Sequence, residues 1–337
     1  MKGMIDSQTL VDLAATERDK PASIVEGAYF DNQSLELDLC FFDSLTLTKS
    51  TRSGRPEPLV LLPPHKKLVT NLLGWKRKDG TRLYRRVYFS VARKNSKSTL
   101  CAALAVYFLV MDNEQKPEIY LLAKTREQAS IVFDAACDFI NAHEELRSIL
   151  KITPYSKHIS NPLNGGIIKA LSGEGKQQHG KNPSVCIFDE LHVWDSSEQE
   201  LFDSMTSGSV ARKQPTFIFV TTAGVDENTI CGREYQYASK VQKGLIEDPG
   251  YLPMIYELDR TDNWRDESNW IKANPCLGDI VSIQALREMR DKALNSPTDA
   301  VAFQRLQCNQ WVNSLSTWIP THKWDLCKWS GEAIANV

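Results

Sequence analysis

From Val87 onward, short apolar segments alternate with longer segments whose apolar residues recur every three or four positions. Short apolar runs bounded by polar residues predict buried strands, and the three-to-four spacing predicts helices with one buried face. The predicted strands are Val87–Ala92, Glu118–Lys124, Gly166–Leu171, Ser184–Phe188, Thr216–Thr221 and Tyr251–Leu258, and the helices between them are Ser98–Val110, Glu127–Asn141 and Glu198–Met205. This alternation predicts an α/β fold with a mostly parallel sheet flanked by helices.

The two ends of the chain show different patterns. The first 55 residues favour helical segments and loops, whereas six tryptophans lie after residue 260, among them Trp270 and Trp311. Helices are predicted at Ser282–Asn295 and Pro297–Trp311, which indicates a small, mainly helical C-terminal subdomain. The predicted division is an N-terminal segment (1–55), an α/β core (56–260), a helical subdomain (261–320) and the start of a linker (321–337).

Composition is that of an ordinary globular protein and excludes several classes. The 337 residues carry 40 Lys plus Arg against 42 Asp plus Glu, so net charge neither favours nor excludes a nucleic-acid partner. The eight cysteines form no C-x-x-C pair and are scattered away from the six histidines, which argues against a zinc site and a disulfide framework. The chain has no apolar run long enough for a membrane span and no secretory pattern, so we expect a cytosolic protein.

The first candidate for chemistry is the segment Ala92–Thr99, which follows a predicted strand and opens a predicted helix. A helix start attracts anionic phosphate through its free N–H groups and its dipole. In the Walker A pattern, Lys97 would reach the β and γ phosphates and Ser98 would bind Mg²⁺. Both glycines of that pattern are replaced here, by Val91 and Ser96. A basic surface loop with Ser98 as a helix cap is the alternative.

The second candidate is an acidic pair at the end of a predicted strand. Asp189 and Glu190 follow four apolar residues. In a phosphate-loop ATPase the first acid holds Mg²⁺ and the second polarises the attacking water. The alternative is a pair of solvated carboxylates without a role. Because both candidate segments lie at carboxyl ends of buried strands, where open α/β sheets bind ligands, their combination favours a nucleotide site.

A third strand ends in small hydroxyl residues. The run Phe217–Val220 leads into Thr221, Thr222, Ala223 and Gly224. A polar residue at such a strand end, here Thr222, can sense a γ-phosphate. An ordinary strand followed by a tight turn is the alternative.

These segments, in this order, resemble the large terminase subunit of tailed phages, specifically the HK97-type group. The resemblance covers roughly residues 55–330. The segments that carry it are Arg82–Ser98, Ala123–Ala129, His179–Pro183 with Phe188–His192, Trp270–Gly278, and Asn309–Val312 with Trp318. The segment Arg82–Ser98 is similar to the family's entry strand and deviant phosphate loop, and Phe188–His192 is similar to its Walker B region.

The resemblance implies an ASCE-type P-loop NTPase that hydrolyses ATP with Mg²⁺ and drives double-stranded DNA into a viral capsid. It further implies a homo-oligomeric ring, a pentamer, on the portal protein in the host cytoplasm, and a small terminase subunit as partner. Full-length members carry a nuclease domain, which we expect to begin near Val337. We therefore expect nuclease activity only in a longer parent chain.

Site roles follow from the motifs together with the resemblance. The expected catalytic residues are Glu190, Lys97 and Arg93, and the expected metal ligands are Ser98 and Asp189. The expected nucleotide-binding residues are Arg93, Lys94, Asn95, Ser96, Lys97, Ser98, Thr99, His65 and Thr222. His65 stands where the family more often has a glutamine that reads adenine, and it offers one hydrogen bond in its place.

Two arginines, one histidine and the C-terminal tryptophans are further candidates for functional roles. Arg126 and Arg212 are candidates for an arginine finger that reaches a neighbouring subunit, against the alternative of a solvated surface arginine. His192 would orient Glu190 or contact DNA. The tryptophans after residue 260 are more typical of core packing than of base stacking.

Two other functions remain open. A helicase would need a second RecA-like domain, for which residues 260–337 are too few. A nucleotide-binding remnant without hydrolysis would agree with the glycine-free loop. The retained Lys97, Ser98, Asp189 and Glu190 argue against such a remnant.

Overall fold

The computed structural model describes residues 25–48, 54–173 and 180–312. Its centre is an eight-stranded sheet with the order β12-β5-β11-β10-β6-β9-β8-β7. The strands are β5 (Arg86–Ser90), β6 (Glu118–Ala123), β7 (Lys151–Thr153), β8 (His158–Asn161), β9 (Gly166–Ser172), β10 (Val185–Phe188), β11 (Thr216–Thr221) and β12 (Tyr251–Ile255). The ladders from β12 through β9 are parallel, and β8 and β7 add an antiparallel edge.

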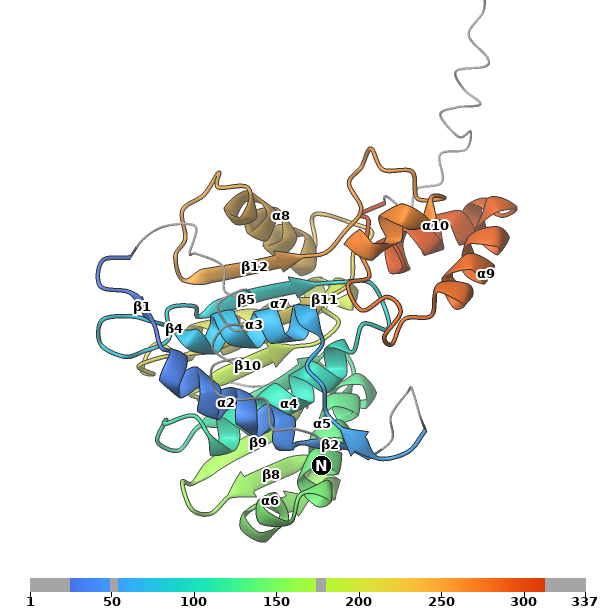
Figure 1. The fold of residues 1–337 in the computed structure, drawn as a ribbon. Helices are drawn as coiled ribbons and strands as arrows, with labels where there is room; N and C mark the ends of the chain where they lie inside the picture. Colours follow the sequence, from blue (N-terminus) through green and yellow to red (C-terminus); the bar gives the residue numbers. More distant parts are fainter. Residues whose placement is uncertain (1–24, 49–53, 174–179, 313–337) are drawn as a thin grey trace, which may run out of the picture.

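Helices cover both faces of the sheet, as Figure 1 shows. They are α2 (Asn32–Ser44), α3 (Pro63–Gly74), α4 (Lys97–Val110), α5 (Arg126–Ala142), α6 (Glu144–Ile149), α7 (Gln199–Ser207), α8 (Ile230–Gln242), α9 (Ile283–Leu294) and α10 (Pro297–Leu306). Four short strands form two further ladders: β1 (Tyr29–Phe30) pairs with β4 (Trp75–Lys76), and β2 (Thr46–Leu47) pairs with β3 (Glu57–Pro58).

Alternation along the strands assigns one set of side chains to each face, because successive residues of a strand point in opposite directions. Ile119, Ile187 and Ile218 belong to one hydrophobic cluster with residues of α2, α3, α4 and α5. Tyr120, Phe188 and Phe219 belong to a second cluster with residues of α7 and α8. Both faces of the central strands are therefore buried, which explains why these strands are continuous apolar runs in the sequence.

The α/β prediction, with a mostly parallel sheet and a mainly helical C-terminal subdomain, is confirmed. The sequence did not predict the edge strands β7 and β8 or the helices α3, α6 and α8. The final predicted helix, Pro297–Trp311, is too long, because α10 ends at Leu306 and the chain then turns through Asn309, whose φ is +53°. Among the helices that the structure describes, none combines the length and apolar character needed to span a bilayer.

A C-terminal subdomain, residues 261–312, lies beyond the carboxyl ends of β5, β11 and β12 (Figure 1). Its apolar core is built around Trp270, which is fully buried and contacts Phe303 edge-on at 5.6 Å between ring centroids. The prediction that tryptophan in this region serves packing is confirmed for Trp270. Trp318, Trp324 and Trp329 lie outside the described residues, as does His179.

A buried ion pair joins the segment before β5 to the segment after α4. Arg82, just before β5, donates to Asp112, just after α4, at 2.6 Å, and the two side chains are 3% and 8% exposed. Arg82 also donates to the Thr216 hydroxyl at 3.2 Å and to the Gln214 carbonyl at 2.9 Å. The guanidinium thus joins the entry to β5, the end of α4 and the start of β11.

We expect Arg82→Ala to lower the free energy of unfolding by about 3–5 kcal/mol, because it leaves the buried Asp112 carboxylate without its partner. Replacing both residues with apolar ones, Arg82→Met with Asp112→Leu, should recover most of that loss. Urea unfolding measures both variants. The exposed pair Arg287–Glu267 provides the control, since Arg287→Ala should cost less than about 1 kcal/mol. A loss no larger in Arg82→Ala than in Arg287→Ala would contradict this account.

Candidate nucleotide site

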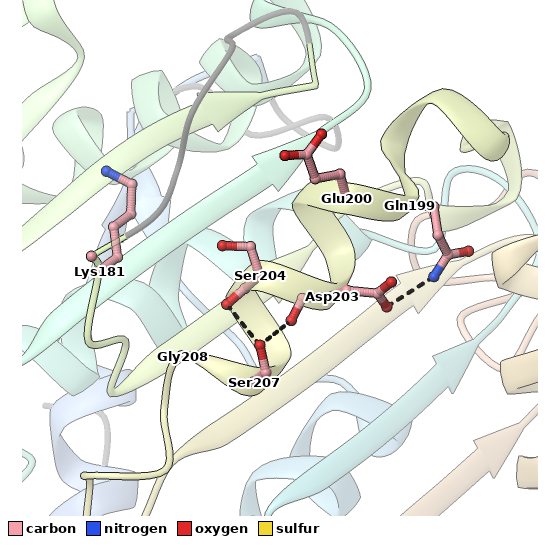
Figure 2. Close-up of a pocket in the computed structure, with 8 residues that line it drawn as sticks. Lys181, Gln199, Glu200, Asp203, Ser204, Ser207 and Gly208 are labelled. Carbon is pink, nitrogen blue, oxygen red and sulfur yellow. Dashed lines mark hydrogen bonds between the residues drawn. The ribbon is translucent and has the colours of Figure 1, made fainter.

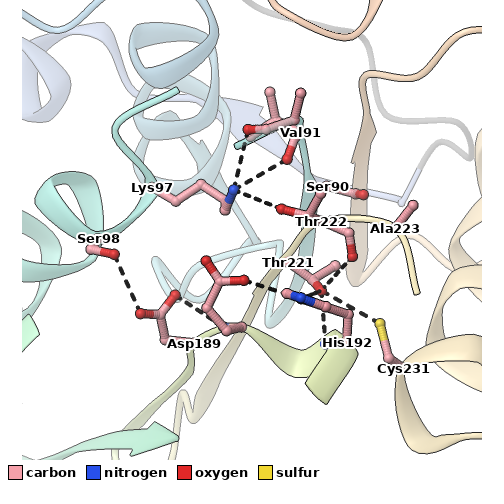
Figure 3. Close-up of polar contacts among 12 residues, drawn as sticks. Ser90, Val91, Lys97, Ser98, Asp189, His192, Thr221, Thr222, Ala223 and Cys231 are labelled. Carbon is pink, nitrogen blue, oxygen red and sulfur yellow. Dashed lines mark hydrogen bonds and ion pairs between the residues drawn. The ribbon is translucent and has the colours of Figure 1, made fainter. Parts of the chain in front are cut away.

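Three adjacent strands bring the predicted segments together at one edge of the sheet. β11 lies between β5 and β10, with Thr221 opposite Ser90 and Phe219 opposite Phe188. The residues that follow these strand ends are therefore neighbours: the loop from Val91, the acidic pair from Asp189, and Thr222. Figure 3 shows them converging on one space.

The loop between β5 and α4 takes its shape without glycine. Lys94 and Ser96 have φ values of +68° and +53°, in the left-handed region that glycine adopts most readily. Glu190 also lies there, with a φ of +50°. Strained backbone of this kind costs of order 1–3 kcal/mol per residue and concentrates at functional sites. Three such residues around one space therefore indicate a site rather than an ordinary strand end.

The backbone N–H groups of this loop divide into two sets. Those of Val91, Ala92 and Arg93 donate to carbonyls of Thr221, Ala273 and Leu306 at 2.9–3.2 Å. For the N–H groups of residues 94–99, the residues that the structure describes offer no acceptor. These groups surround the first turn of α4, where the helix dipole is positive, so this is the chemistry of an anion site.

Lys97 is buried, and its ammonium group is held by the protein itself. Nζ donates to the Thr222 hydroxyl at 2.9 Å and to the carbonyls of Val91 and Ala92 at 3.2 Å each (Figure 3). Burial lowers the pKa of Lys97, and the carboxylates of Glu190 and Asp189 act in the opposite direction. The ammonium group thus lies at the base of the loop, beside the predicted sensor Thr222.

Asp189 and Ser98 face each other across the site. The Ser98 hydroxyl donates to Asp189 Oδ2 at 3.4 Å, and Asp189 Oδ1 accepts from the Glu190 N–H at 3.0 Å. Burial, and then the neighbouring Glu190 charge, raise the pKa of Asp189 to about 6. A buried carboxylate beside a hydroxyl offers the hard oxygen ligands that Mg²⁺ prefers, so these two residues fit the predicted metal site.

Glu190 lies against the ring of His192. His192 Nδ1 is 3.1 Å from Glu190 Oε2, at ion-pair distance but without an aligned hydrogen bond. Burial on its own raises the pKa of Glu190, but the His192 ring and the Lys97 and Arg93 charges outweigh it and lower the pKa to about 2. The Thr221 hydroxyl accepts from the His192 backbone N–H at 2.9 Å. His192 is 5% exposed, which favours the predicted orienting role over contact with DNA.

Two of the predicted nucleotide-binding side chains, those of His65 and Asn95, are hydrogen-bonded to other residues of the protein. His65 is buried, and its Nε2 donates to the Asn95 carbonyl at 2.9 Å under the loop, which is not the adenine contact predicted for it. The Asn95 side chain is fully buried and turned away from the site, so only its backbone N–H remains for phosphate. By contrast, Arg93 and Lys94 are exposed on the loop, and Thr99 is partly exposed on the first turn of α4.

The two finger candidates differ in their surroundings. Arg212 donates to the carbonyls of Asn182, Gln115 and Lys116 at 2.9–3.1 Å and pairs with Glu114 and Glu118, so its guanidinium holds the amino ends of the strands together. The prediction of a finger at Arg212 is therefore wrong, and so is its alternative of a solvated arginine. Arg126 is exposed at the start of α5, beside a shallow hollow that it lines with Thr125.

The sequence missed two residues that contact this site from the C-terminal subdomain. Asn274 contacts Asn95 of the loop, and Asn309 contacts Ala223 after β11. Both lie in segments already noted as family-like, W-I-K-A-N-P and N-Q-W-V. Their local sequence gave no sign of a contact with residues 86 to 179 positions away.

A separate hollow of about 610 Å³ lies beside α7, away from these residues (Figure 2). Its lining mixes Lys181 with Glu200, Asp203 and small hydroxyl residues. None of the predicted site residues lines it. Volume therefore does not identify the functional site here, whereas the converging polar groups do.

Comparison with known proteins agrees with this geometry. A family model described as "Terminase large subunit, ATPase domain" matches residues 63–240, just over half of the chain. The large terminase subunit of Enterobacteria phage HK97 is 30% identical over 239 residues, which are 71% of this chain and 46% of that protein. Protein YmfN of Escherichia coli K12 is 27% identical over 153 residues, 45% of this chain and 33% of that protein.

A solved structure of a large terminase subunit also has a similar fold. The crystal structure of the HK97 bacteriophage large terminase matches with a TM-score of 0.71 at 28% identity, covering 87% of this chain and 58% of that one. This match confirms the predicted P-loop NTPase fold class. The chain spans less than half the length of the two sequence relatives.

A second family model, "Terminase large subunit, endonuclease domain", matches residues 245–335. That match begins before β12 and covers the C-terminal subdomain, so it starts well before Val337, where the sequence placed the beginning of the nuclease region. Its described part contributes β12 to the central sheet and α9 and α10 to the subdomain. In the described ranges, no group of three or more His, Cys, Asp and Glu is arranged to hold a metal ion.

The left-handed backbone of Ser96 predicts how substitutions at this position change the free energy of unfolding. Ser96→Gly should leave the free energy of unfolding unchanged or raise it by up to about 1 kcal/mol, because glycine carries no steric cost at this φ. Ser96→Val should lower it by more than about 1 kcal/mol, since a β-branched residue is a steric outlier there. Urea unfolding of the two variants measures this difference. Equal stabilities, or a glycine variant less stable than the valine variant, would contradict the loop geometry.

Proposed function

The chain belongs to the terminase large-subunit family, and on that premise we propose that it is the ATP-hydrolysing motor part of a viral DNA-packaging enzyme. The observation that carries this proposal is the convergence of Lys97, Asp189 and Glu190 around one row of free N–H groups. Each of the three is the residue type that phosphoryl transfer to water requires at its position.

ATP is the proposed substrate and Mg²⁺ the proposed metal. The free N–H groups at the start of α4 would hold the phosphate oxygens, with Lys97 on the β and γ phosphates and Arg93 and Lys94 adding positive charge from the loop surface. Ser98 and Asp189 would hold Mg²⁺, which neutralises phosphate charge when bound. Thr222, already in contact with Lys97, would sense the γ-phosphate.

Glu190 is the proposed general base for the attacking water. Its low pKa keeps the carboxylate charged at neutral pH, so it orients and polarises water rather than donating a proton. Its Oε2 is buried against the His192 ring, whereas the side chain as a whole is 26% exposed, so water would approach the carboxylate from the side away from His192. His192 restricts the carboxylate from one side.

The proposed setting follows from the family. Double-stranded DNA is the proposed cargo, and the portal protein and a small terminase subunit are the proposed partners. The active assembly would be a pentameric ring at the procapsid portal in the host cytoplasm, with Arg126 as the remaining candidate for a finger. DNA contacts in such a motor would fall on phosphates, because it must move any sequence.

The endonuclease-domain model matches residues 245–335, so part of the family's nuclease region lies within this chain. A remnant that binds nucleotide without hydrolysis is the alternative, favoured by the strained loop without glycine.

We expect Mg²⁺-dependent ATP hydrolysis by this chain, reduced about 100- to 10,000-fold in Glu190→Gln, because removal of a general base costs that factor. Lys97→Ala should lose both hydrolysis and nucleotide affinity. Phosphate release measures turnover, and calorimetry with ATP measures binding. The controls are Glu145→Gln and Lys151→Ala, exposed positions on α6 and β7 that should keep parental activity. Binding without turnover in the parent chain and Glu190→Gln alike would favour the remnant, and absence of both binding and turnover would overturn the proposal.

A further inference from the structure

The phosphate loop is hydrogen-bonded to the C-terminal subdomain as well as to the sheet. The Ala92 N–H donates to the Ala273 carbonyl at 3.1 Å, and the Arg93 N–H donates to the Leu306 carbonyl at 2.9 Å. The Ala92 side chain is fully buried in the hydrophobic cluster of that subdomain, beside residues such as Trp270 and Cys308. The first residues of the loop are therefore part of the subdomain's packing.

A pair of buried asparagines extends this connection. Asn95 Nδ2 donates to Asn274 Oδ1 at 3.1 Å, and Asn95 Oδ1 accepts from the Cys276 N–H at 3.2 Å. Asn274 in turn donates to the carbonyls of Trp270 and Gln307 at 3.1 and 2.7 Å. Asn95 and Asn274 are both fully buried, so loss of either one leaves polar groups without a partner.

Asn95 also closes the loop on itself. Its Nδ2 lies within hydrogen-bonding distance of the Ala92 and Arg93 carbonyls, at 3.1 and 3.3 Å. The residues on either side of Asn95 are the left-handed Lys94 and Ser96. The asparagine thus sits at the centre of the strained turn and joins it to the subdomain.

A third asparagine connects the subdomain to three strand ends. Asn309 Oδ1 accepts from the Ala223 N–H after β11 at 2.6 Å. Its Nδ2 donates to the Ser90 hydroxyl at the end of β5 at 3.0 Å and to the Tyr256 carbonyl after β12 at 2.7 Å. β12, β5 and β11 are neighbours in the sheet, so one fully buried side chain spans the edge from which both the phosphate loop and Thr222 depart.

The neighbouring Trp311 closes the same contact. It stacks on Tyr235 of α8 with 4.9 Å between ring centroids and lies directly over Gly224. A Cβ at Gly224 would lie 2.8 Å from the indole ring, so the close approach of the turn after β11 depends on that glycine.

We propose that Asn274 and Asn309 are positioning residues of the nucleotide site, through which the C-terminal subdomain imposes the shape of a phosphate loop that lacks glycine. This inference rests on the proposed ATPase function. A glycine loop adopts left-handed turns at no steric cost, whereas this loop has two non-glycine residues there and must be held by its surroundings. Asn274 holds the turn through Asn95, and Asn309 holds the ends of β5 and β11.

A double-mutant cycle tests the link. We expect Asn274→Ala to weaken ATP binding about tenfold, as the loss of one or two buried hydrogen bonds implies. Asn95→Ala should weaken it by a similar factor. The double variant should be no weaker than the worse single one, because the two side chains act through one contact. Calorimetry with ATP and Mg²⁺ measures affinity, and urea unfolding measures stability in parallel.

Asn309→Ala is measured in the same way and should also weaken ATP binding about tenfold. Asn309→Asp keeps the acceptor for the Ala223 N–H and should retain more affinity than alanine. Asn269→Ala is the matched control, since Asn269 is partly exposed and its side chain donates to a carbonyl of its own subdomain. Unchanged affinity in Asn274→Ala and Asn309→Ala, or losses in the cycle that simply add, would overturn the inference.

Amide hydrogen exchange without nucleotide separates this inference from the proposed function. Asn274→Ala should speed exchange at Ala92 and Arg93 more than tenfold relative to the Asn269→Ala control. Faster exchange in a protein that binds no ATP would support the contact between Asn274 and the loop and would overturn the ATPase proposal. Unchanged exchange and affinity in variants of an active ATPase would overturn only the positioning role of Asn274.

Discussion

The structure depends on a loop that must adopt left-handed backbone without glycine, between β5 and α4. Lys94 and Ser96 occupy that region and give the row of free N–H groups its direction. Such a loop holds its shape only if its surroundings supply what glycine would otherwise provide. Those surroundings are the sheet on one side, through the contact of Val91 with Thr221, and the subdomain on the other, through Asn95.

Charge at the site follows from the same arrangement. Lys97 is buried among the loop carbonyls and Thr222, near two carboxylates whose pKa values move in opposite directions. The pKa of Asp189 rises because it is buried beside another acid, and the pKa of Glu190 falls because His192, Lys97 and Arg93 surround it. Two adjacent acids thus acquire different pKa values from their positions at one strand end.

Local pattern was sufficient to predict the central strands and to predict that Lys97, Ser98, Asp189 and Glu190 lie at one edge of the sheet, because these residues follow buried strands whose apolar runs are visible in the sequence. It failed where tertiary contacts decide. The pattern of apolar residues does not reveal that His65 contacts the loop backbone or that Arg212 joins the amino ends of strands. Nor does it reveal that Asn274 and Asn309 contact the site. An asparagine has no periodicity that identifies its partner, and these partners are distant in sequence.

The most direct test of the central claim is amide hydrogen exchange at residues 94–99, with and without saturating ATP and Mg²⁺, in the Glu190→Gln variant, in which we expect hydrolysis to be slow. These N–H groups have no acceptor among the described residues, so they should exchange rapidly in the free protein and become protected when phosphate oxygens bind them. Protection confined to this stretch, with little change at residues 91–93, is the predicted result. Bound nucleotide, verified by calorimetry, with no protection at residues 94–99 would contradict the account.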